Sequence, residues 1–197
     1  GEQTGTTFYA PVNNANCYTL SETIIDSAEL AGIGEIGMVG YYYTHTTPMS
    51  QKNNVTIWLQ PTTKTVFGSI NDMVALDTAT AVQVYTGTLN CSQGWNYFMF
   101  DNAYVWDGHS NLLVIVDDNS GARNSNSYTF GASSCSGYKT IYFYSNTDNP
   151  DPAAPSNFAG NGKLRAQTRP VMRLVSCGIA CQAPVVSAVN VDYQGAS

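Results

Sequence analysis

The chain of 197 residues is long enough to bury the core of one domain. Eight Lys and Arg residues stand against fourteen Asp and Glu, and the net charge of −6 leaves no basic surface for nucleic acid or anionic lipid. The longest apolar run, residues 112–116, is too short to cross a bilayer, so we predict no membrane insertion.

Uncharged polar residues replace charged ones in this sequence. Charged residues make up 11% of the chain, whereas Ser, Thr, Asn and Gln account for 63 of the 197 residues. All four glutamates lie within the first 35 residues, and the strand-forming residues Thr, Tyr and Val are common. Because the strongest helix formers are scarce, we predict an all-β chain.

Runs of strand-forming residues, bounded by Gly, Pro, Asn and Asp, follow one another through the chain. We predict strands at residues 18–25, 34–44, 54–59, 81–89, 97–100, 111–116, 127–130, 140–144 and 171–175. Short strands separated by loops are typical of a two-sheet antiparallel β-sandwich, and we expect the jelly-roll type.

Two of these runs show how they should pack. Val55, Ile57 and Leu59 alternate with polar or amphipathic residues, which predicts a strand with one buried face. Residues 112–116 are continuously apolar, which predicts a central strand that is covered on both faces.

Two later segments have a different character. Residues 149–162 contain too many prolines for a strand and predict one long surface loop. Residues 177–197 have the composition of a linker followed by an opening strand. We therefore predict a β-domain over residues 1–176 and a linker with a truncated following module over residues 177–197.

The sequence carries little that is typical of an enzyme. Its two histidines, His45 and His109, lie in turn-like segments, and we find no nucleophile elbow, zinc-binding helix, phosphate loop or dinucleotide fingerprint. Two Asp residues that converge in space could still form a glycosidase pair. We predict that the domain is not an enzyme and keep a weak hydrolase as a competing hypothesis.

The most site-like acidic cluster follows the apolar run. Asp117, Asp118 and Asn119 lie in a turn that ends at Gly121, and carboxylate and amide oxygens are the ligands that Ca²⁺ prefers. We name these three residues as candidate Ca²⁺ ligands. The alternative is a turn in which they only end the strand. A second oxygen-rich turn occupies residues 148–151.

Aromatic residues are the other candidates for binding. Tyrosine and tryptophan rings that a strand displays outward can stack on sugars or anchor protein partners. The candidate contact residues are Trp58, Tyr41, Tyr43, Tyr142 and Tyr144. The alternative for each ring is packing in the core.

The chain contains five cysteines, Cys17, Cys91, Cys135, Cys177 and Cys181. An odd number leaves at least one thiol free, or paired outside this chain, if the others are oxidised. The low charge suggests a secreted protein, in which disulfides are permitted.

Six segments together carry a family resemblance. They are residues 19–30 (TLSETIIDSAEL), 54–59 (NVTIWL), 84–87 (VYTG), 106–118 (WDGHSNLLVIVDD), 142–150 (YFYSNTDNP) and 169–174 (RPVMRL). In this order they resemble the adhesin-type β-sandwich modules of secreted and surface proteins of bacteria, which are related to the cleaved-adhesin domains of gingipain-type proteases. Residues 177–197 resemble the start of a fibronectin type III module.

The resemblance implies a non-catalytic jelly-roll module that attaches to glycans or host proteins. Some members of this family hold Ca²⁺ structurally. We therefore predict an extracellular or cell-surface binding module of a larger protein, with neighbouring domains in the same chain. The alternative is an accessory domain of a secreted peptidase or glycosidase whose catalytic domain lies outside residues 1–197.

Overall fold

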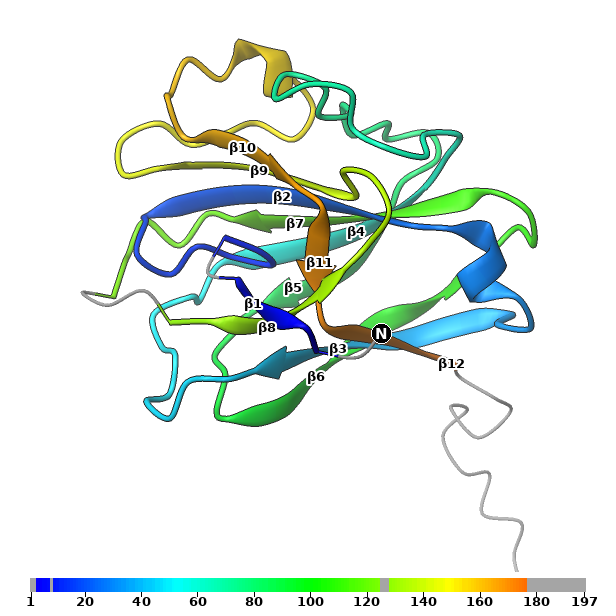
Figure 1. The fold of residues 1–197 in the computed structure, drawn as a ribbon, viewed down its shortest axis with the longest axis horizontal. Coiled ribbons are helices and arrows are strands. Elements are labelled where there is room, and N and C mark those ends of the chain that lie inside the picture. Colours follow the sequence, from blue (N-terminus) through cyan, green and yellow to red (C-terminus); the bar gives the residue numbers. More distant parts are fainter. Residues whose placement is uncertain (1–2, 8, 125–127, 177–197) are drawn as a thin grey trace, which may run out of the picture.

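The computed structural model describes residues 3–7, 9–124 and 128–176 (Figure 1). The strands of this part are β1 (Gly5–Thr7), β2 (Tyr18–Ile25), β3 (Glu35–Tyr43), β4 (Val55–Thr62), β5 (Val82–Gly87), β6 (Gly94–Val105), β7 (Asn111–Asp118), β8 (Phe130–Ser134), β9 (Thr140–Ser145), β10 (Lys163–Ala166), β11 (Thr168–Pro170) and β12 (Met172–Ser176). Two short 3-10 helices, η1 (Ser27–Leu30) and η2 (Pro155–Asn157), are the helical elements of these ranges. The predicted all-β class is confirmed. No helix in the described ranges has the length and apolar character that a membrane span requires.

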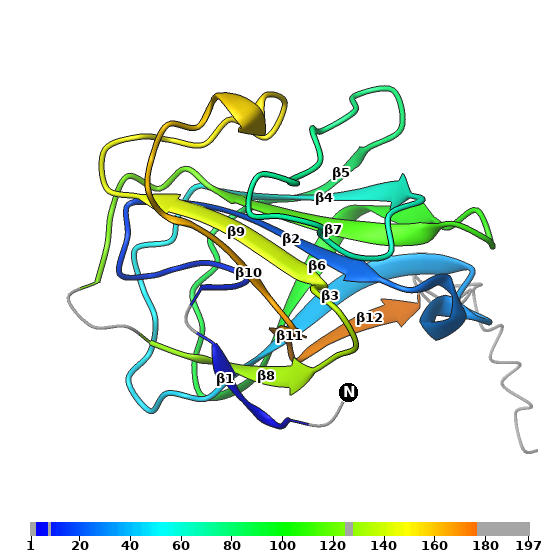
Figure 2. The same cartoon turned by 45° about the horizontal axis from the view of Figure 1, so that its top comes forward.

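The strands form two antiparallel sheets that pack face to face (Figure 2). Sheet A has the order β1-β8-β3-β12, with β11 also pairing with β8 and β6 with β3. Sheet B has the order β10-β9-β2-β7-β4-β5. The first strands pair with later ones in reverse order: β1 with β8, β2 with β7, β3 with β6 and β4 with β5. These are the pairs that form when a long eight-stranded hairpin is rolled into two sheets, as in a jelly roll.

The main core lies between the sheets. Val55, Ile57 and Leu59 of β4 are fully buried in it, which confirms the predicted one-sided strand. Strand β7 lies between β2 and β4, and its alternate residues enter two different apolar clusters. Because both faces of β7 are covered, its continuous apolar run is explained and the predicted central strand is confirmed.

The second apolar cluster lies on the outer face of sheet B. Two loops, residues 63–81 and 146–162, cover this face (Figures 1 and 2). Phe67 and Met73 come from the first loop and Phe158 from the second. The backbone N–H of Leu76 donates to the carbonyl of Pro152 over 2.7 Å, so the loops are joined to each other. The predicted loop over residues 149–162 contains η2 and otherwise runs as a loop to β10.

A buried acid lies beneath these loops. Glu22 of β2 is 1% exposed, and its Oε2 accepts a 2.9 Å hydrogen bond from the backbone N–H of Val74. Burial raises the pKa of Glu22 well above its usual range. The first loop is therefore fastened to sheet B through a carboxyl group that is favoured in its neutral form.

Candidate functional site

The tyrosine triplet of β3 shows which aromatic rings the protein displays. Tyr41 and Tyr43 point into the core between the sheets and are 1% and 0% exposed. The prediction that these two rings contact a ligand is therefore wrong. The half-buried ring of Tyr42 points to the opposite face of the strand, because successive side chains alternate.

The other predicted contact rings belong to sheet B. Tyr142 is 6% exposed, and its ring stacks on Tyr9 with centroids 4.8 Å apart, so its prediction as a contact residue is also wrong. Tyr144 is half-buried and stacks on Tyr9 as well, at 5.4 Å. Trp58 is half-buried against the second apolar cluster, beneath the two loops. Ligand contact by Tyr144 and Trp58 stays a prediction.

Three aromatic side chains and one arginine form a continuous group on the outer surface of sheet A. The rings of Trp95 and Tyr97 on β6 have centroids 6.0 Å apart and planes 23° apart, and Tyr42 on β3 meets Trp95 edge-on at 5.5 Å. The guanidinium carbon of Arg173 on β12 lies 4.0 Å from the centre of the Trp95 ring. We call Tyr42, Trp95, Tyr97 and Arg173 the aromatic face.

One glycine makes this arrangement possible. Gly40 of β3 pairs with Tyr97 on one side and with Arg173 on the other. A Cβ atom at residue 40 would lie 2.7 Å from Cε1 of Tyr97. The absence of a side chain therefore lets the Tyr97 ring lie across β3, where Nη1 of Arg173 donates a 2.9 Å hydrogen bond to the tyrosine hydroxyl.

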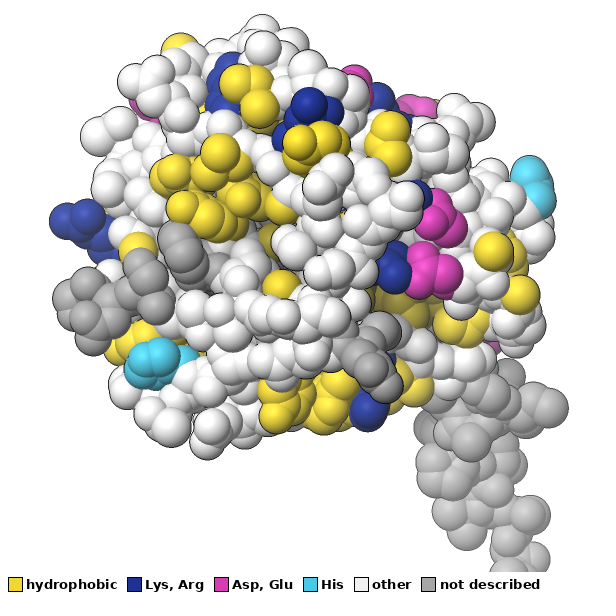
Figure 3. Space-filling view, in the orientation of Figure 1, with side chains coloured by type: hydrophobic (Ala, Val, Ile, Leu, Met, Phe, Trp, Pro, Cys, Tyr) yellow, Lys and Arg dark blue, Asp and Glu magenta, His cyan; other side chains and the backbone are white. Residues whose placement is uncertain are grey.

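The aromatic face is open to solvent. Tyr97 is 45% exposed, and its neighbour Met99 on the same side of β6 is 70% exposed. Figure 3 shows hydrophobic side chains gathered along the lower edge of the view, where Figure 1 has β3, β6 and β12, with a basic side chain among them. Sequence reasoning missed Trp95 and Tyr97. Residues 97–100 are all apolar, which shows that both faces of this strand carry apolar side chains but not that one face is left uncovered, so the sequence held no clear signal for these rings.

The three predicted Ca²⁺ ligands do not form one set. Asp118, at the end of β7, has the parity of the residues that face the main core, and it is fully buried. Its Oδ2 lies 2.6 Å from Nζ of Lys52, which also donates to the carbonyls of Asn16 (2.7 Å) and Ala122 (3.0 Å). The prediction of Asp118 as a metal ligand is therefore wrong, because a buried ammonium already occupies its carboxylate.

Asp117 faces the opposite way, toward the loops over sheet B. It is 3% exposed, and its Oδ2 accepts a 2.6 Å hydrogen bond from Nδ2 of Asn119. Its Oδ1 is buried without a hydrogen-bond partner in the described part of the chain. The side-chain amide of Asn149 donates to Oδ1 of Asn119, so the two oxygen-rich turns that the sequence singled out meet here.

Several carboxylates lie close together around Asp117. Burial, with the carboxylates of Asp118 and Asp151 nearby, raises the pKa of Asp117 to about 7, against the hydrogen bond from Asn119. A cavity of 180 Å³ lies in the adjoining loop, lined by Asp148, Asn149, Asp151, Ala154, Asn157, Phe158 and Ala159. Over the described ranges no three His, Cys, Asp or Glu side chains are placed to hold a metal ion. A cation here would need amide and carbonyl oxygens as well, which suits Ca²⁺ and not Zn²⁺.

The histidines are held by local turns. The backbone N–H of Thr47 donates to Nδ1 of His45 over 3.0 Å. The His109 side chain is 80% exposed, and its Nδ1 lies 3.5 Å from Oδ1 of Asp107. Both imidazoles thus lie in loops, where the sequence had placed them.

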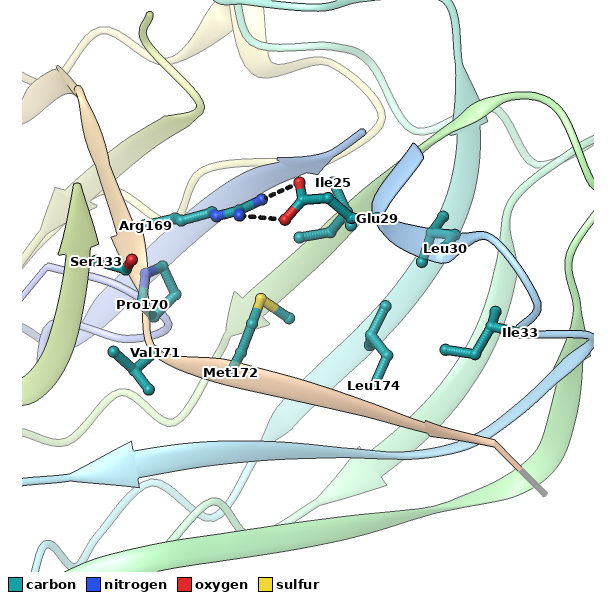
Figure 4. Close-up of a pocket in the computed structure, with 10 residues that line it drawn as sticks. All are labelled: Ile25, Glu29, Leu30, Ile33, Ser133, Arg169, Pro170, Val171, Met172 and Leu174. Carbon is teal, nitrogen blue, oxygen red and sulfur yellow. Dashed lines mark hydrogen bonds and ion pairs between the residues drawn. The ribbon is translucent and has the colours of Figure 1, made fainter. Parts of the chain in front are cut away.

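A further pocket of 190 Å³ opens between η1 and β12 (Figure 4). Ile33, Met172 and Leu174 contribute to its apolar wall. At one end Arg169 pairs bidentately with Glu29, and this guanidinium holds the pKa of Glu29 below its usual range. Because the two charges satisfy each other, the pocket offers a ligand little beyond apolar contact.

Three of the five cysteines lie in the described ranges, and all three are free thiols. Cys17 and Cys135 are half-buried, and Cys91 is buried, which raises its pKa to about 12. Cys177 and Cys181 lie outside the described residues, as do the predicted linker and fibronectin-type strand of residues 177–197.

Comparison with known proteins returns one solved structure. No family model and no curated protein matches the chain. The solved structure is that of the cysteine protease and lectin-like domains of Cwp84, a surface layer associated protein of Clostridium difficile. The similarity has a TM-score of 0.40 and 13% sequence identity, and it covers 79% of this chain and 31% of that chain. The chain therefore spans about a third of the length of the solved protein, and we base its function on its own geometry.

Proposed function

We propose that this chain is a non-catalytic binding module of an extracellular or cell-surface protein, and that it binds carbohydrate through the aromatic face. The observation that carries the proposal is the pair of adjacent rings of Trp95 and Tyr97 on the outside of a sheet, with a hydrogen-bonding guanidinium beside them. Rings of this kind stack on the apolar faces of sugars, while polar groups at their edges bind hydroxyl groups.

The chemistry of the aromatic face supports binding without catalysis. Its four residues supply stacking surface and hydrogen-bond donors. General acid–base catalysis needs a group that gains or loses a proton near the working pH, and neither tyrosine, tryptophan nor arginine does so ordinarily. If the face binds a sugar, it holds the sugar without cleaving it.

Ca²⁺ forms the second part of the proposal. We propose that the ion binds between the end of β7 and the loop of residues 146–162, with Asp117 and Asn119 among its ligands. Support comes from the buried Oδ1 of Asp117, which has no hydrogen-bond partner among the residues that the structure describes, and from the oxygen-rich loop beside it. A bound ion would neutralise buried charge and stiffen the loop. The relation to cleaved-adhesin modules stays a prediction.

Retention on immobilised polysaccharides tests the carbohydrate proposal. Wild-type protein and the variants Trp95→Ala and Tyr97→Ala are run by affinity electrophoresis through gels that contain acidic or neutral polysaccharides. Each variant should bind roughly 2- to 10-fold more weakly, since an aromatic contact contributes about 0.5–1.5 kcal/mol. Val105→Ala is the matched control, because Val105 is 68% exposed on the same strand and lies eight residues from Tyr97.

Two results would overturn this proposal. One is retention of the wild type on a polysaccharide with no loss in either aromatic variant. The other is no retention on any polysaccharide together with binding to a host protein, which would make the module a protein-binding one. A loss confined to Tyr144→Ala would move the site to the other predicted rings.

A further inference from the structure

The aromatic face contains a cation, Arg173, that no carboxylate of the described residues neutralises. Four other basic side chains form ion pairs with carboxylates: Lys52 with Asp118, Lys64 with Asp72, Lys139 with Asp26 and Arg169 with Glu29. The contacts that the described structure gives to Arg173 are the Trp95 ring and the Tyr97 hydroxyl. Its charge is therefore available to a ligand.

Two contacts hold this guanidinium in place. The Trp95 ring lies beneath it at 4.0 Å, and the Tyr97 hydroxyl accepts a hydrogen bond from Nη1. A guanidinium has five N–H donors in a planar fork, so most of them stay free after the bond to Tyr97. A guanidinium that is held in place before a ligand arrives loses little side-chain entropy on binding, and its fork matches the two oxygens of a carboxylate.

We infer that the aromatic face binds an acidic glycan, in which a carboxylated sugar stacks on Tyr97 and pairs its carboxylate with Arg173. This inference rests on the proposed function and names the class of carbohydrate. An Asp or Glu side chain of a peptide would satisfy Arg173, but a second residue of that peptide would be needed to cover the 45% exposed ring of Tyr97. A uronic acid uses both features at once, because its ring and its carboxylate are joined directly.

The charge of the whole chain sharpens this inference. A net charge of −6 repels polyanions in general, so binding of an acidic glycan must come from a local site. Because a single arginine carries the attraction, added salt should weaken the binding only moderately.

The test compares glycans that differ only in their carboxyl groups. Polygalacturonate, alginate and hyaluronan are each measured beside the carboxyl-reduced form by affinity electrophoresis, and the best binder is then measured by calorimetry. The wild type should bind at least one acidic glycan about 10-fold more tightly than its reduced form, and Arg173→Gln should remove this preference. Arg173→Lys keeps the charge without the fork and should lose most of the preference.

Two further variants separate the roles of charge and position. Arg123→Gln is the matched control, because Arg123 is also exposed and its removal changes the net charge equally. It should leave binding unchanged. Tyr97→Phe keeps the stacking ring but removes the hydroxyl that orients Arg173. It should therefore weaken binding of the acidic glycan more than binding of its carboxyl-reduced form. Circular dichroism and a melting curve establish that each variant is folded.

The outcomes are distinguishable. Equal binding of acidic and reduced glycans, with no effect of Arg173→Gln, would overturn this inference and leave the carbohydrate proposal standing. Binding of neutral glycans alone would do the same. Binding of an acidic peptide that depends on Arg173, with no glycan bound, would overturn both the inference and the proposed function.

Discussion

At the scale of single residues, two adjacent aspartates on β7 have different environments. Asp118 faces the main core and pairs with the buried ammonium of Lys52. Asp117 faces the loops over sheet B, where its Oδ1 has no hydrogen-bond partner among the described residues. Because neighbouring residues of a strand point to opposite faces, one sequence motif contributes a structural ion pair on one side and a candidate cation ligand on the other.

The raised pKa of Asp117 predicts how stability depends on pH in the absence of Ca²⁺. The folded protein binds the carboxyl proton of Asp117 more tightly than the unfolded chain does. The stability that this proton contributes is therefore fully present below about pH 4 and is lost as the pH rises through about 7. Asp117→Asn removes the titration. The unfolding free energy of the variant, relative to wild type, should therefore rise by roughly 2–4 kcal/mol between pH 4 and pH 8.

Urea denaturation in EDTA, at several pH values in this range, measures that difference. Comparing the variant with wild type at each pH cancels the contributions of other groups, including Glu22, whose pKa is also raised. A difference that stays constant from pH 4 to pH 8 would show that Asp117 titrates normally in the folded protein.

At the scale of elements, the outer surface of sheet A depends on the pairing of three strands. β6 supplies Trp95 and Tyr97, β3 supplies Tyr42 and Gly40, and β12 supplies Arg173. β12 is far from the other two strands in sequence, and the three lie side by side because β6 and β12 both pair with β3. The aromatic face is therefore a property of the sheet, because no single strand contains all of its residues.

Gly40→Ala should disrupt the aromatic face with little loss of stability. The new Cβ would lie 2.7 Å from the Tyr97 ring, which must swing off β3 and give up its bond to Arg173. Because Tyr97 is exposed and can move, the unfolding free energy should fall by less than about 1 kcal/mol. Glycan binding should weaken as much as in Tyr97→Ala.

Gly34→Ala is the control for this substitution, because a Cβ at residue 34 meets nothing within 4 Å. Affinity electrophoresis measures binding, and the difference in tryptophan fluorescence between variant and wild type detects a change near Trp95, since Trp58 and Trp106 lie elsewhere and contribute to both. Unchanged binding by Gly40→Ala would mean that the position of Tyr97 over β3 does not matter to the ligand.

At the scale of the whole molecule, two loops cover the outer face of sheet B. The loops of residues 63–81 and 146–162 share an apolar cluster and one backbone hydrogen bond, from Leu76 to Pro152. The second loop also contacts the end of β7 through Asn149 and Asn119. A cation at that contact would add a second link between this loop and the end of β7.

Addition of Ca²⁺ should therefore raise the melting temperature of EDTA-treated protein. An ion at 100 times its dissociation constant would add about 2.7 kcal/mol of stability, provided that the unfolded chain does not bind it. Asp117→Asn should abolish the rise, and Mg²⁺ at the same concentration should have a smaller effect, since its coordination is more rigid. Calorimetry and melting curves measure both effects. An equal rise in the variant would place the ion elsewhere.

Much of the fold could be predicted from local patterns. The alternation of Val55, Ile57 and Leu59, and the continuous apolar run of β7, correspond to strands whose burial the structure confirms. The short strands β1, β10 and β11 were missed because three or four residues carry too little periodicity. Strand β6 is longer than the predicted strand at residues 97–100. The additional residues at its two ends include exposed ones, and they belong to the strand because they pair with β3.

By itself, the sequence determined the all-β class and the central position of β7, because each depends on residue types at short spacing, whereas Asp117 and Asp118, predicted in a turn, are the last residues of β7. Only the tertiary structure decided that Tyr42 and not Tyr41 or Tyr43 faces outward, since a run of three tyrosines has no polar alternation to set its parity. The tertiary structure likewise paired Asp118 with Lys52 and brought Arg173 over Trp95. These partners are distant in sequence, and it is the winding of the two sheets that makes them neighbours.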